Sequence, residues 1–156
     1  SHDLVLKEGR QLLQYATTEG RPTLRAKIAK RMADKYNTKV DPDDILITTG
    51  SQQCLDFVGK LFLDPDDVVL CESPSYLGAL NAFNAYQPKF VEVPTDNGGL
   101  IPEELDKILE TTPNCKFIYV IPDFHNPTGR TWSMERRQKF MEVVNKHNLP
   151  VVEDNP

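Results

Sequence analysis

The chain has 156 residues, of which 39% are hydrophobic and 26% charged, and its net charge is −5 at pH 7. This composition is typical of a soluble globular protein and not of a disordered one. The negative charge argues against a nucleic-acid partner, because no stripe of lysine or arginine offsets it. No apolar run approaches the ~20 residues that a membrane span needs, and the amino end has no signal-peptide pattern.

The cysteines are Cys54, Cys71 and Cys115. An odd number without CxxC spacing argues against a disulfide framework and against a metal site. Cys71 and Cys115 lie in strand-like runs, where buried free thiols are the simplest interpretation. We therefore expect a reducing compartment and place the protein in the cytoplasm.

Helical and strand patterns alternate along the chain. The first helix is predicted at 22–36, where the apolar residues recur with helical spacing and Pro22 suits the first turn. A strand at 45–49, a helix at 54–62 and a strand at 68–71 follow. The remaining predicted elements are a helix at 76–86, a strand at 90–93, a helix from Pro102 to Leu109, a strand at 116–121, a helix from Ser133 and a last strand at 150–153.

Strands that alternate with helices of this length predict an α/β fold in three layers, with a mostly parallel sheet between two layers of helices. The segment 37–44 reads as a linker. It divides an amino-terminal arm and helix at 1–44 from an α/β body at 45–156. Both ends look cut, and we expect the chain to be a piece of a longer protein.

Polar residues gather where four of the five predicted strands end, at 48–53, 72–76, 123–129 and 153–155. The carboxyl ends of parallel strands converge on one edge of the sheet, where open α/β sheets place ligands. The sequence therefore predicts a ligand crevice at this edge.

The first two clusters each allow two interpretations. Ser51 and Gln52 open a helix behind Gly50, so free amides and the helix dipole could hold an anion such as a phosphate. A plain N-cap serine behind a turn glycine is the alternative. Tyr76 follows a proline turn and could stack on a planar ligand, or it could be a core tyrosine at a helix start.

The other two clusters are also ambiguous on their own. Asn126 can donate and accept hydrogen bonds at a strand end, but Asn-Pro and Thr-Gly are also common turn material. Asp154 would lie at the base of the same crevice, where a buried carboxylate needs a positive partner such as a protonated ring nitrogen. An N-cap or a solvated strand end is its alternative role.

The order and spacing of these motifs resemble those of the class I/II aminotransferases of the pyridoxal-phosphate-dependent fold type I superfamily. The resemblance runs from about Leu13 to Pro156. The segments 13–20, 49–53, 72–76 and 126–129, which read LQYATTEG, TGSQQ, ESPSY and NPTG, are most similar to the 2-aminoadipate and multi-substrate branch. The fold implied is an incomplete large domain with five of the family's seven strands.

The resemblance implies a role for each candidate residue toward pyridoxal 5'-phosphate. Ser51 and Gln52 would hold the phosphate, and Tyr76 would stack on the pyridine ring. Asn126 would hydrogen-bond the phenolic oxygen, and Asp154 would pair with the protonated pyridine nitrogen.

The resemblance also implies partners. Tyr15 matches a tyrosine that reaches the phosphate of the partner subunit, which implies a homodimer. The substrates implied are a small amino acid and a 2-oxo acid. Ser73-Pro74 and Asn126-Pro127 fall where the family often has cis peptide bonds.

Transamination needs a lysine as Schiff-base partner and proton carrier. The family places this lysine well downstream of the aspartate, and none of the eleven lysines in the chain matches that context. We expect all of them to be solvated surface charges. The tyrosine expected just after Pro156 and the carboxyl-terminal arginine that binds the substrate are also missing. We therefore expect the chain alone to be inactive and to bind the cofactor weakly.

The family topology orders its sheet 3-2-4-5-6-7-1. Two of these strands are missing, so we expect the 3-2-4-5 core to persist and the strand at 45–49 to make an unusual contact elsewhere.

Two other functions remain open from the sequence. One is the ligand-sensing domain of a helix-turn-helix transcription regulator that shares the aminotransferase fold. Such regulators usually depart from Asn-Pro-Thr-Gly at the asparagine, whereas Asn126 is intact. The other is a pyridoxal-phosphate-dependent lyase, which this region does not separate from a transaminase.

Overall fold

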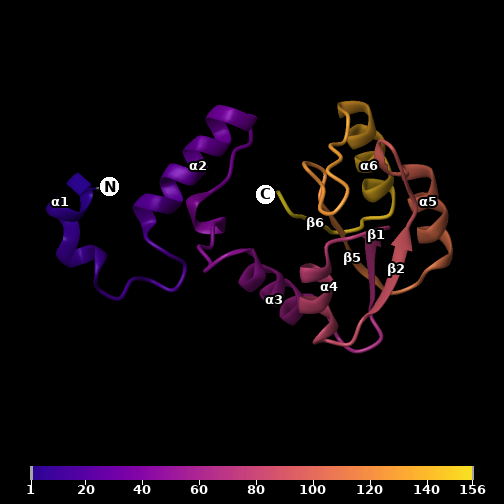
Figure 1. Cartoon of the computed structure of the whole chain (residues 1–156), viewed down its shortest axis with the longest axis horizontal. Helices are drawn as coiled ribbons and strands as arrows, with labels where there is room; N and C mark the ends of the chain where they lie inside the picture. The colour runs from indigo at the N-terminus through magenta and orange to yellow at the C-terminus, as the bar shows by residue number, and fades with distance from the viewer. Residues whose placement is uncertain (1, 156) are drawn as a thin grey trace. The chain divides into compact units, whose positions relative to one another are not determined.

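The computed structural model describes residues 2–155, so Pro156, the end of the predicted α/β body, lies outside the described residues. The chain forms two compact units, Ser1–Ser51 and Gln52–Pro156. Figure 1 shows the elements of each, and the two units are described separately below.

The first unit holds α1 (His2–Leu12), α2 (Pro22–Tyr36) and the short 3-10 helix η1 (Pro42–Asp44). Helix α2 has the predicted bounds: Pro22 begins it and Asn37 ends it in the left-handed conformation, with φ 52°. Arg25 ties α2 to η1, because its buried guanidinium donates to Pro42 O at 2.7 Å and to Asp43 Oδ1 at 2.9 Å. Helix α1 was not predicted.

The predicted strand at 45–49 is wrong. In the structure this segment joins neither sheet and runs as irregular backbone. Its contact lies within the first unit, where the Ile47 amide donates to Glu19 O at 3.0 Å and the Ile47 side chain packs where Gly20 lacks a Cβ. An apolar β-branched run forms a strand only beside a strand partner, and this segment has none in either sheet.

The second unit contains a four-stranded parallel sheet in the order β2-β1-β5-β6. Its strands are β1 (Val68–Glu72), β2 (Lys89–Val93), β5 (Cys115–Val120) and β6 (Val151–Glu153). The strands β2, β1, β5 and β6 correspond to the predicted strands 3, 2, 4 and 5, so the predicted 3-2-4-5 order is confirmed. All five residues of β1 are buried, as expected of a central parallel strand.

Helices cover both faces of this sheet, as Figure 1 shows. On one face, α5 (Pro102–Thr111) and α6 (Met134–Lys146) close a core that includes Leu70, Ile118 and Phe140. On the other, α3 (Ser51–Phe62) and α4 (Leu77–Asn84) close a core that includes Phe83, Phe117 and Tyr119. The three-layer α/β prediction is confirmed.

A two-stranded antiparallel ladder, β3 (Thr95–Asp96) and β4 (Gly99–Leu100), was not predicted. It lies between β2 and α5 in the chain. Gly99 has φ +100° and a Cβ there would collide with the Trp132 indole, so a glycine is required at this turn.

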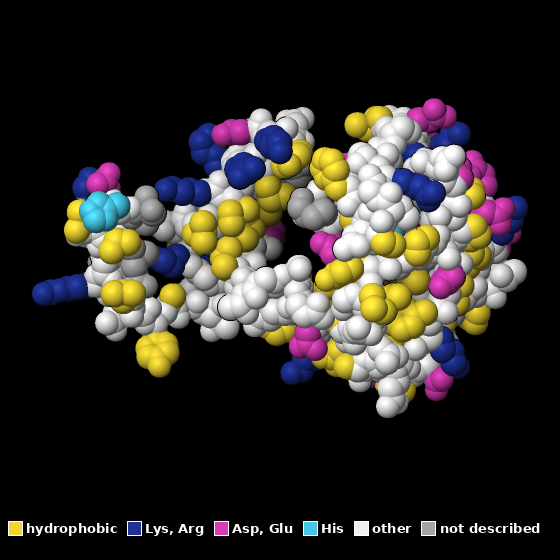
Figure 2. All heavy atoms as spheres, in the orientation of Figure 1, with side chains coloured by type: hydrophobic (Ala, Val, Ile, Leu, Met, Phe, Trp, Pro, Cys, Tyr) yellow, Lys and Arg dark blue, Asp and Glu magenta, His cyan; other side chains and the backbone are white. Residues whose placement is uncertain are grey.

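Figure 2 shows acidic and basic side chains interspersed over the second unit, and hydrophobic side chains at the surface over α2 in the first. Among residues 2–155, no helix combines the length and the apolar character that crossing a membrane requires.

Candidate functional site

The carboxyl ends of the four parallel strands meet at one edge of the sheet. The register pairs Cys71 of β1 with Tyr119 of β5, and Val120 of β5 with Glu153 of β6. The segments that follow β1, β5 and β6 therefore start side by side. Three of the four predicted polar clusters lie on these segments, as the sequence predicted.

Gln52 and Tyr76 are brought together by Gly78. The Gln52 side-chain amide donates to Gly78 O at 3.1 Å. The Tyr76 ring lies against the same glycine, because a Cβ on Gly78 would come within 2.5 Å of the ring's Cζ. Tyr76 is the N-cap of α4 and is half-buried against the α3–α4 core, so one part of its ring is covered and the rest is accessible.

Asp154 is held by a buried tyrosine. The Tyr119 hydroxyl donates to Asp154 Oδ2 at 2.8 Å, and the Asp154 amide donates to Val120 O at 2.9 Å. Burial first, and then the Asp154 carboxylate, raise the pKa of Tyr119 far above its ordinary value, with a smaller contribution from Tyr76 nearby. The hydroxyl therefore stays protonated and keeps its proton available for the hydrogen bond to Asp154.

The turn after β5 is fixed at both ends. Arg137 of α6 forms an ion pair with Asp123 at 2.7 Å. Inside the turn, the His125 amide donates to Arg130 O at 2.8 Å, and Gly129 takes φ +71°. Asn126 lies at the exposed outer side of this turn. The Asn126-Pro127 and Ser73-Pro74 peptide bonds are both cis, as predicted.

Beneath this turn lies a buried carboxylate, Glu72, which is 2% exposed. Burial raises its pKa to about 7, and the effect is partly offset by the amides of Ile121 and Leu100 and by the Arg130 charge. The Ile121 amide donates to Glu72 Oε2 at 3.0 Å. The Trp132 indole N–H also favours the ionised form, but it completes no hydrogen bond among the described residues.

The structure thus links Gln52, Tyr76 and Asp154 through Gly78 and Tyr119. Asn126 belongs to the same edge of the sheet, but no contact joins its side chain to the other three. Ser51 is the exposed first residue of α3, directly after Gly50 with φ +102°. Tyr15 is fully exposed in the first unit.

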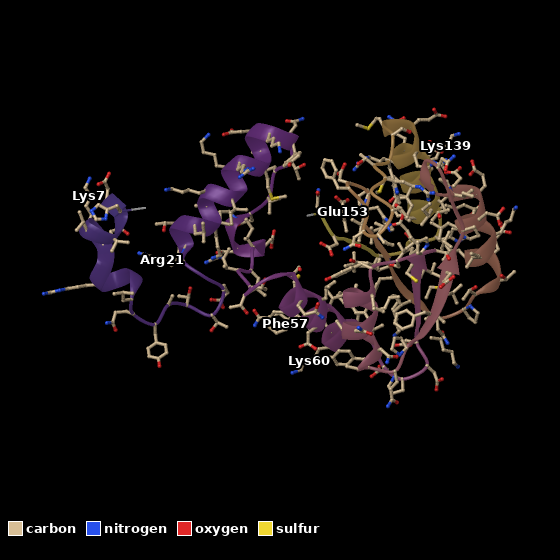
Figure 3. The ribbon with its side chains drawn as sticks, viewed as in Figure 1. Lys7, Arg21, Phe57, Lys60, Lys139 and Glu153 are labelled. Carbon is tan, nitrogen blue, oxygen red and sulfur yellow. The ribbon has the colours of Figure 1, made fainter. Side chains whose placement is uncertain are left out.

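No lysine is buried among the described residues. Ten of the eleven are exposed, and Lys116 is half-buried at the start of β5, where it pairs with Asp67 at 3.3 Å. That position is the end of the sheet opposite the candidate site. Figure 3 shows Lys60 and Lys139 at the surface of the second unit. The predicted surface role is confirmed for the ten exposed lysines, whereas Lys116 is half-buried.

Sequence reasoning gave no role to Tyr119, Gly78, Glu72 or His125. Tyr119 sits inside an apolar strand run and reads as core. Glu72 offered one signal, since it is the only charged residue of the otherwise apolar run 68–72. A charge in a fully buried strand needs a partner, and that partner comes from a loop whose position the sequence does not specify.

Comparison with known proteins identifies the family. The family model "Aminotransferase class I and II" matches residues 2–155. The chain belongs to this family. It is 39% identical to aromatic-amino-acid aminotransferase 1 of Thermococcus litoralis, covering 99% of this chain and 38% of the relative. It is 41% identical to the 2-aminoadipate transaminase of Thermus thermophilus, covering 97% of this chain and 36% of the relative.

Solved aminotransferase structures superpose closely on the chain. The kynurenine aminotransferase of Pyrococcus horikoshii, solved in complex with PMP, has a TM-score of 0.92 at 38% identity and covers 99% of this chain and 39% of that one. The alpha-aminoadipate aminotransferase of Thermus thermophilus, complexed with N-(5'-phosphopyridoxyl)-L-leucine, has a TM-score of 0.88 at 40% identity. The chain spans less than two fifths of the length of these relatives. The matches support an aminotransferase over the regulator and lyase alternatives.

Proposed function

We propose that the chain is the cofactor-binding part of a pyridoxal-phosphate-dependent aminotransferase, which moves an amino group between an amino acid and a 2-oxo acid. The observation that carries this proposal is the Tyr119–Asp154 contact of 2.8 Å beside the Tyr76 ring. It puts an oriented carboxylate and an aromatic face at one end of a parallel sheet, in a chain of the aminotransferase family.

The residues fit the cofactor. Asp154 is half-buried and has one carboxylate oxygen fixed by Tyr119, so its charge suits a protonated pyridine nitrogen. Tyr76 offers the ring on which the pyridine would stack. Asn126 would donate to the phenolic oxygen, and the amide groups at the start of α3, at Ser51 and Gln52, would hold the phosphate.

Pyridoxal phosphate, when bound, supplies an electron sink for the charge left when Cα of the amino acid loses its proton. The chain's own contribution is electrostatic and geometric. Asp154 holds a proton on the ring nitrogen, and the Tyr119 hydroxyl keeps the carboxylate aimed by donating to one of its oxygens. The Tyr76 ring fixes the plane in which the cofactor lies.

None of the lysines has the surroundings expected of the proton carrier of the reaction, because ten are exposed and Lys116 lies at the opposite end of the sheet. We propose that the chain alone binds the cofactor weakly and does not catalyse transamination. The substrate class we propose is an aromatic or 2-aminoadipate-like amino acid with its 2-oxo acid, since the relatives named above carry those names.

We also propose a homodimer, in which Tyr15 reaches the partner's phosphate site. Its support is the uncovered apolar surface of the first unit, where Leu6 is 71% and Leu13 86% exposed. The proposed location is the cytoplasm, where the free thiols of Cys54, Cys71 and Cys115 remain reduced.

The test is a fluorescence titration with pyridoxamine 5'-phosphate, which has no aldehyde and therefore reports non-covalent binding alone. Asp154→Asn keeps the size of the side chain and removes its charge. We expect this substitution to weaken binding roughly ten- to a hundredfold, because it removes a charge-assisted hydrogen bond.

Glu153→Gln is the matched control. Glu153 is exposed and precedes Asp154 in the chain, so its substitution should leave the affinity unchanged (Figure 3 labels this residue). An unaltered chain that binds no pyridoxamine 5'-phosphate, or an Asp154→Asn chain that binds it as well as the Glu153→Gln control, would overturn the proposal.

A further inference from the structure

A buried pair of ionisable side chains lies directly beneath the turn that carries Asn126. His125 Nε2 is 3.2 Å from Glu72 Oε2, and the two side chains are 4% and 2% exposed. Among the described residues these are two of three polar or charged side chains that are buried. Placing both groups together in the interior has a cost in desolvation, which makes a bystander role a poor explanation for them.

The pair lies on the face of the sheet away from Tyr119. Side chains of a strand alternate between faces. Val69 belongs to the α3–α4 core and Leu70 to the α5–α6 core, so Glu72 continues the α5–α6 side. Trp132 of that core packs beside it. Glu72 and His125 therefore support the candidate site from behind and do not line it.

Hydrogen bonds tie the pair to two strands and to the turn. Glu72, the last residue of β1, accepts the amide of Ile121 just after β5 at 3.0 Å. His125 Nδ1 is 2.9 Å from the Thr128 hydroxyl, which also accepts the Arg130 amide at 3.4 Å. The segment that leads to Tyr76 starts at Glu72, and Asn126 follows His125 directly. The pair thus connects the segment that carries Tyr76 with the segment that carries Asn126, the two proposed cofactor contacts.

We propose that Glu72 and His125 are positioning residues, which hold the Asn126 turn in register with the β1 end that leads to Tyr76. This inference rests on the proposed cofactor site and names what sets its geometry. Neither side chain needs to touch the cofactor. Their effect passes through the backbone of 121–130, which they anchor at Ile121 and Thr128.

Burial shifts the ionisation of both members of the pair. Burial raises the pKa of Glu72 to about 7. Burial also lowers the pKa of His125, with a smaller effect of the Arg130 charge. The other groups that bear on the pair are Arg130 in the turn and, through the Glu72 charge, the Cys71 thiol on β1 and the Tyr119 hydroxyl on β5. Because His125 Nε2 lies 3.2 Å from Glu72 Oε2, a change in the charge of Glu72 near neutral pH should be felt at His125.

The experiment uses the unaltered 156-residue chain and three variants. His125→Leu removes both contacts of the imidazole. Glu72→Gln keeps the size and the hydrogen-bonding groups of the side chain but cannot titrate. Glu92→Gln is the control, because Glu92 is an exposed carboxylate on the neighbouring strand β2 that contacts Ser73 at 2.7 Å and not the pair.

Two readouts separate positioning from simple packing. The first is the NMR shift of the Asn126 amide between pH 5.5 and 8.5. We expect a titration step near pH 7 in the unaltered chain and in Glu92→Gln, and no such step in Glu72→Gln. The second is pyridoxamine 5'-phosphate affinity, which should fall about tenfold in His125→Leu and by less than twofold in Glu92→Gln, since small displacements of binding groups are costly.

An Asn126 amide without a step near pH 7 in the unaltered chain, or with the same step in Glu72→Gln, overturns the inference. So does a folded His125→Leu chain with unchanged affinity. If His125→Leu does not fold, the Asn126 shift in Glu72→Gln decides the matter. The positioning role and the proposed function can fail separately. If Asp154→Asn abolishes binding of the probe but His125→Leu and Glu72→Gln behave like Glu92→Gln, the positioning role fails and the proposed function stands.

Discussion

Gly78 shows how a single residue shapes the candidate site. Its carbonyl accepts the Gln52 side chain, and its missing side chain makes room for the Tyr76 ring. The phosphate end and the ring-stacking end of the proposed site therefore share one backbone position. Any side chain at residue 78 would displace the ring, because the nearest ring atoms lie 2.5 to 2.6 Å from the Cβ position.

We predict that Gly78→Ala weakens pyridoxamine 5'-phosphate binding roughly three- to tenfold, the usual worth of an aromatic stacking contact. The tyrosine ring can swing aside, and alanine favours the helix by up to about 1 kcal/mol, so thermal stability should hold. Gly9→Ala in α1 is the control, because its Cβ would meet Val5 only at 3.8 Å. Full affinity in Gly78→Ala would contradict the role assigned to the Tyr76 ring.

At the scale of elements, local periodicity predicted those segments whose partners are near in the chain. Helix α2 was predicted with its observed bounds, and α6 begins after Ser133, whose hydroxyl accepts the Arg136 amide at 3.2 Å. The parallel strands β1, β2, β5 and β6 were found because each is an apolar run between polar turns. Their observed order required the family resemblance, since periodicity does not say which strands are neighbours.

The elements and contacts that the sequence did not predict correctly also have physical reasons. The segment 45–49 has a strand's composition, but a strand exists only with a partner, and this one is bound to Glu19 instead. The strands β3 and β4 have two residues each, which is too short for an alternation of apolar and polar residues to be recognised. Tyr119 and the Glu72–His125 pair are contacts between segments distant in sequence. Ser51, Gln52, Tyr76, Asn126 and Asp154 were singled out by order and spacing, and their joint role in binding remains a prediction.

For the molecule as a whole, the buried Glu72 should make stability depend on pH. Its pKa is raised from 4.5 to about 7 by burial, so between these values the folded chain holds a proton that the unfolded chain releases. The contribution of Glu72 to the free energy of unfolding is therefore largest below pH 4.5 and is lost as the pH rises to about 7. The slope is at most about 1.4 kcal/mol per pH unit.

Urea unfolding followed by the fluorescence of Trp132, the single tryptophan, measures this effect in the second unit. His125 acts in the opposite direction, because its pKa is lowered and its contribution rises with pH up to 6.5. The difference between Glu72→Gln and the unaltered chain isolates the carboxylate. The free energy of unfolding of Glu72→Gln, relative to that of the unaltered chain, should increase as the pH rises from 4.5 to 7. A difference that does not change with pH would show that Glu72 titrates normally.

The distribution of lysines over the whole chain gives a second prediction. Since ten of the eleven are exposed and the last lies at the opposite end of the sheet, none is placed to react selectively with the aldehyde of pyridoxal phosphate. We expect borohydride reduction followed by peptide mass analysis to find only low, scattered labelling. One stoichiometric adduct at a single lysine would contradict this account.

We propose that the carboxyl edge of the four-stranded sheet is a cofactor site. The most direct measurement is an NMR titration of the assigned chain with pyridoxamine 5'-phosphate. We expect shifts concentrated at Gln52, Tyr76, Asn126 and Asp154, with the Lys116 end of the sheet unchanged. Shifts scattered over the surface, or concentrated away from these four residues, would contradict it.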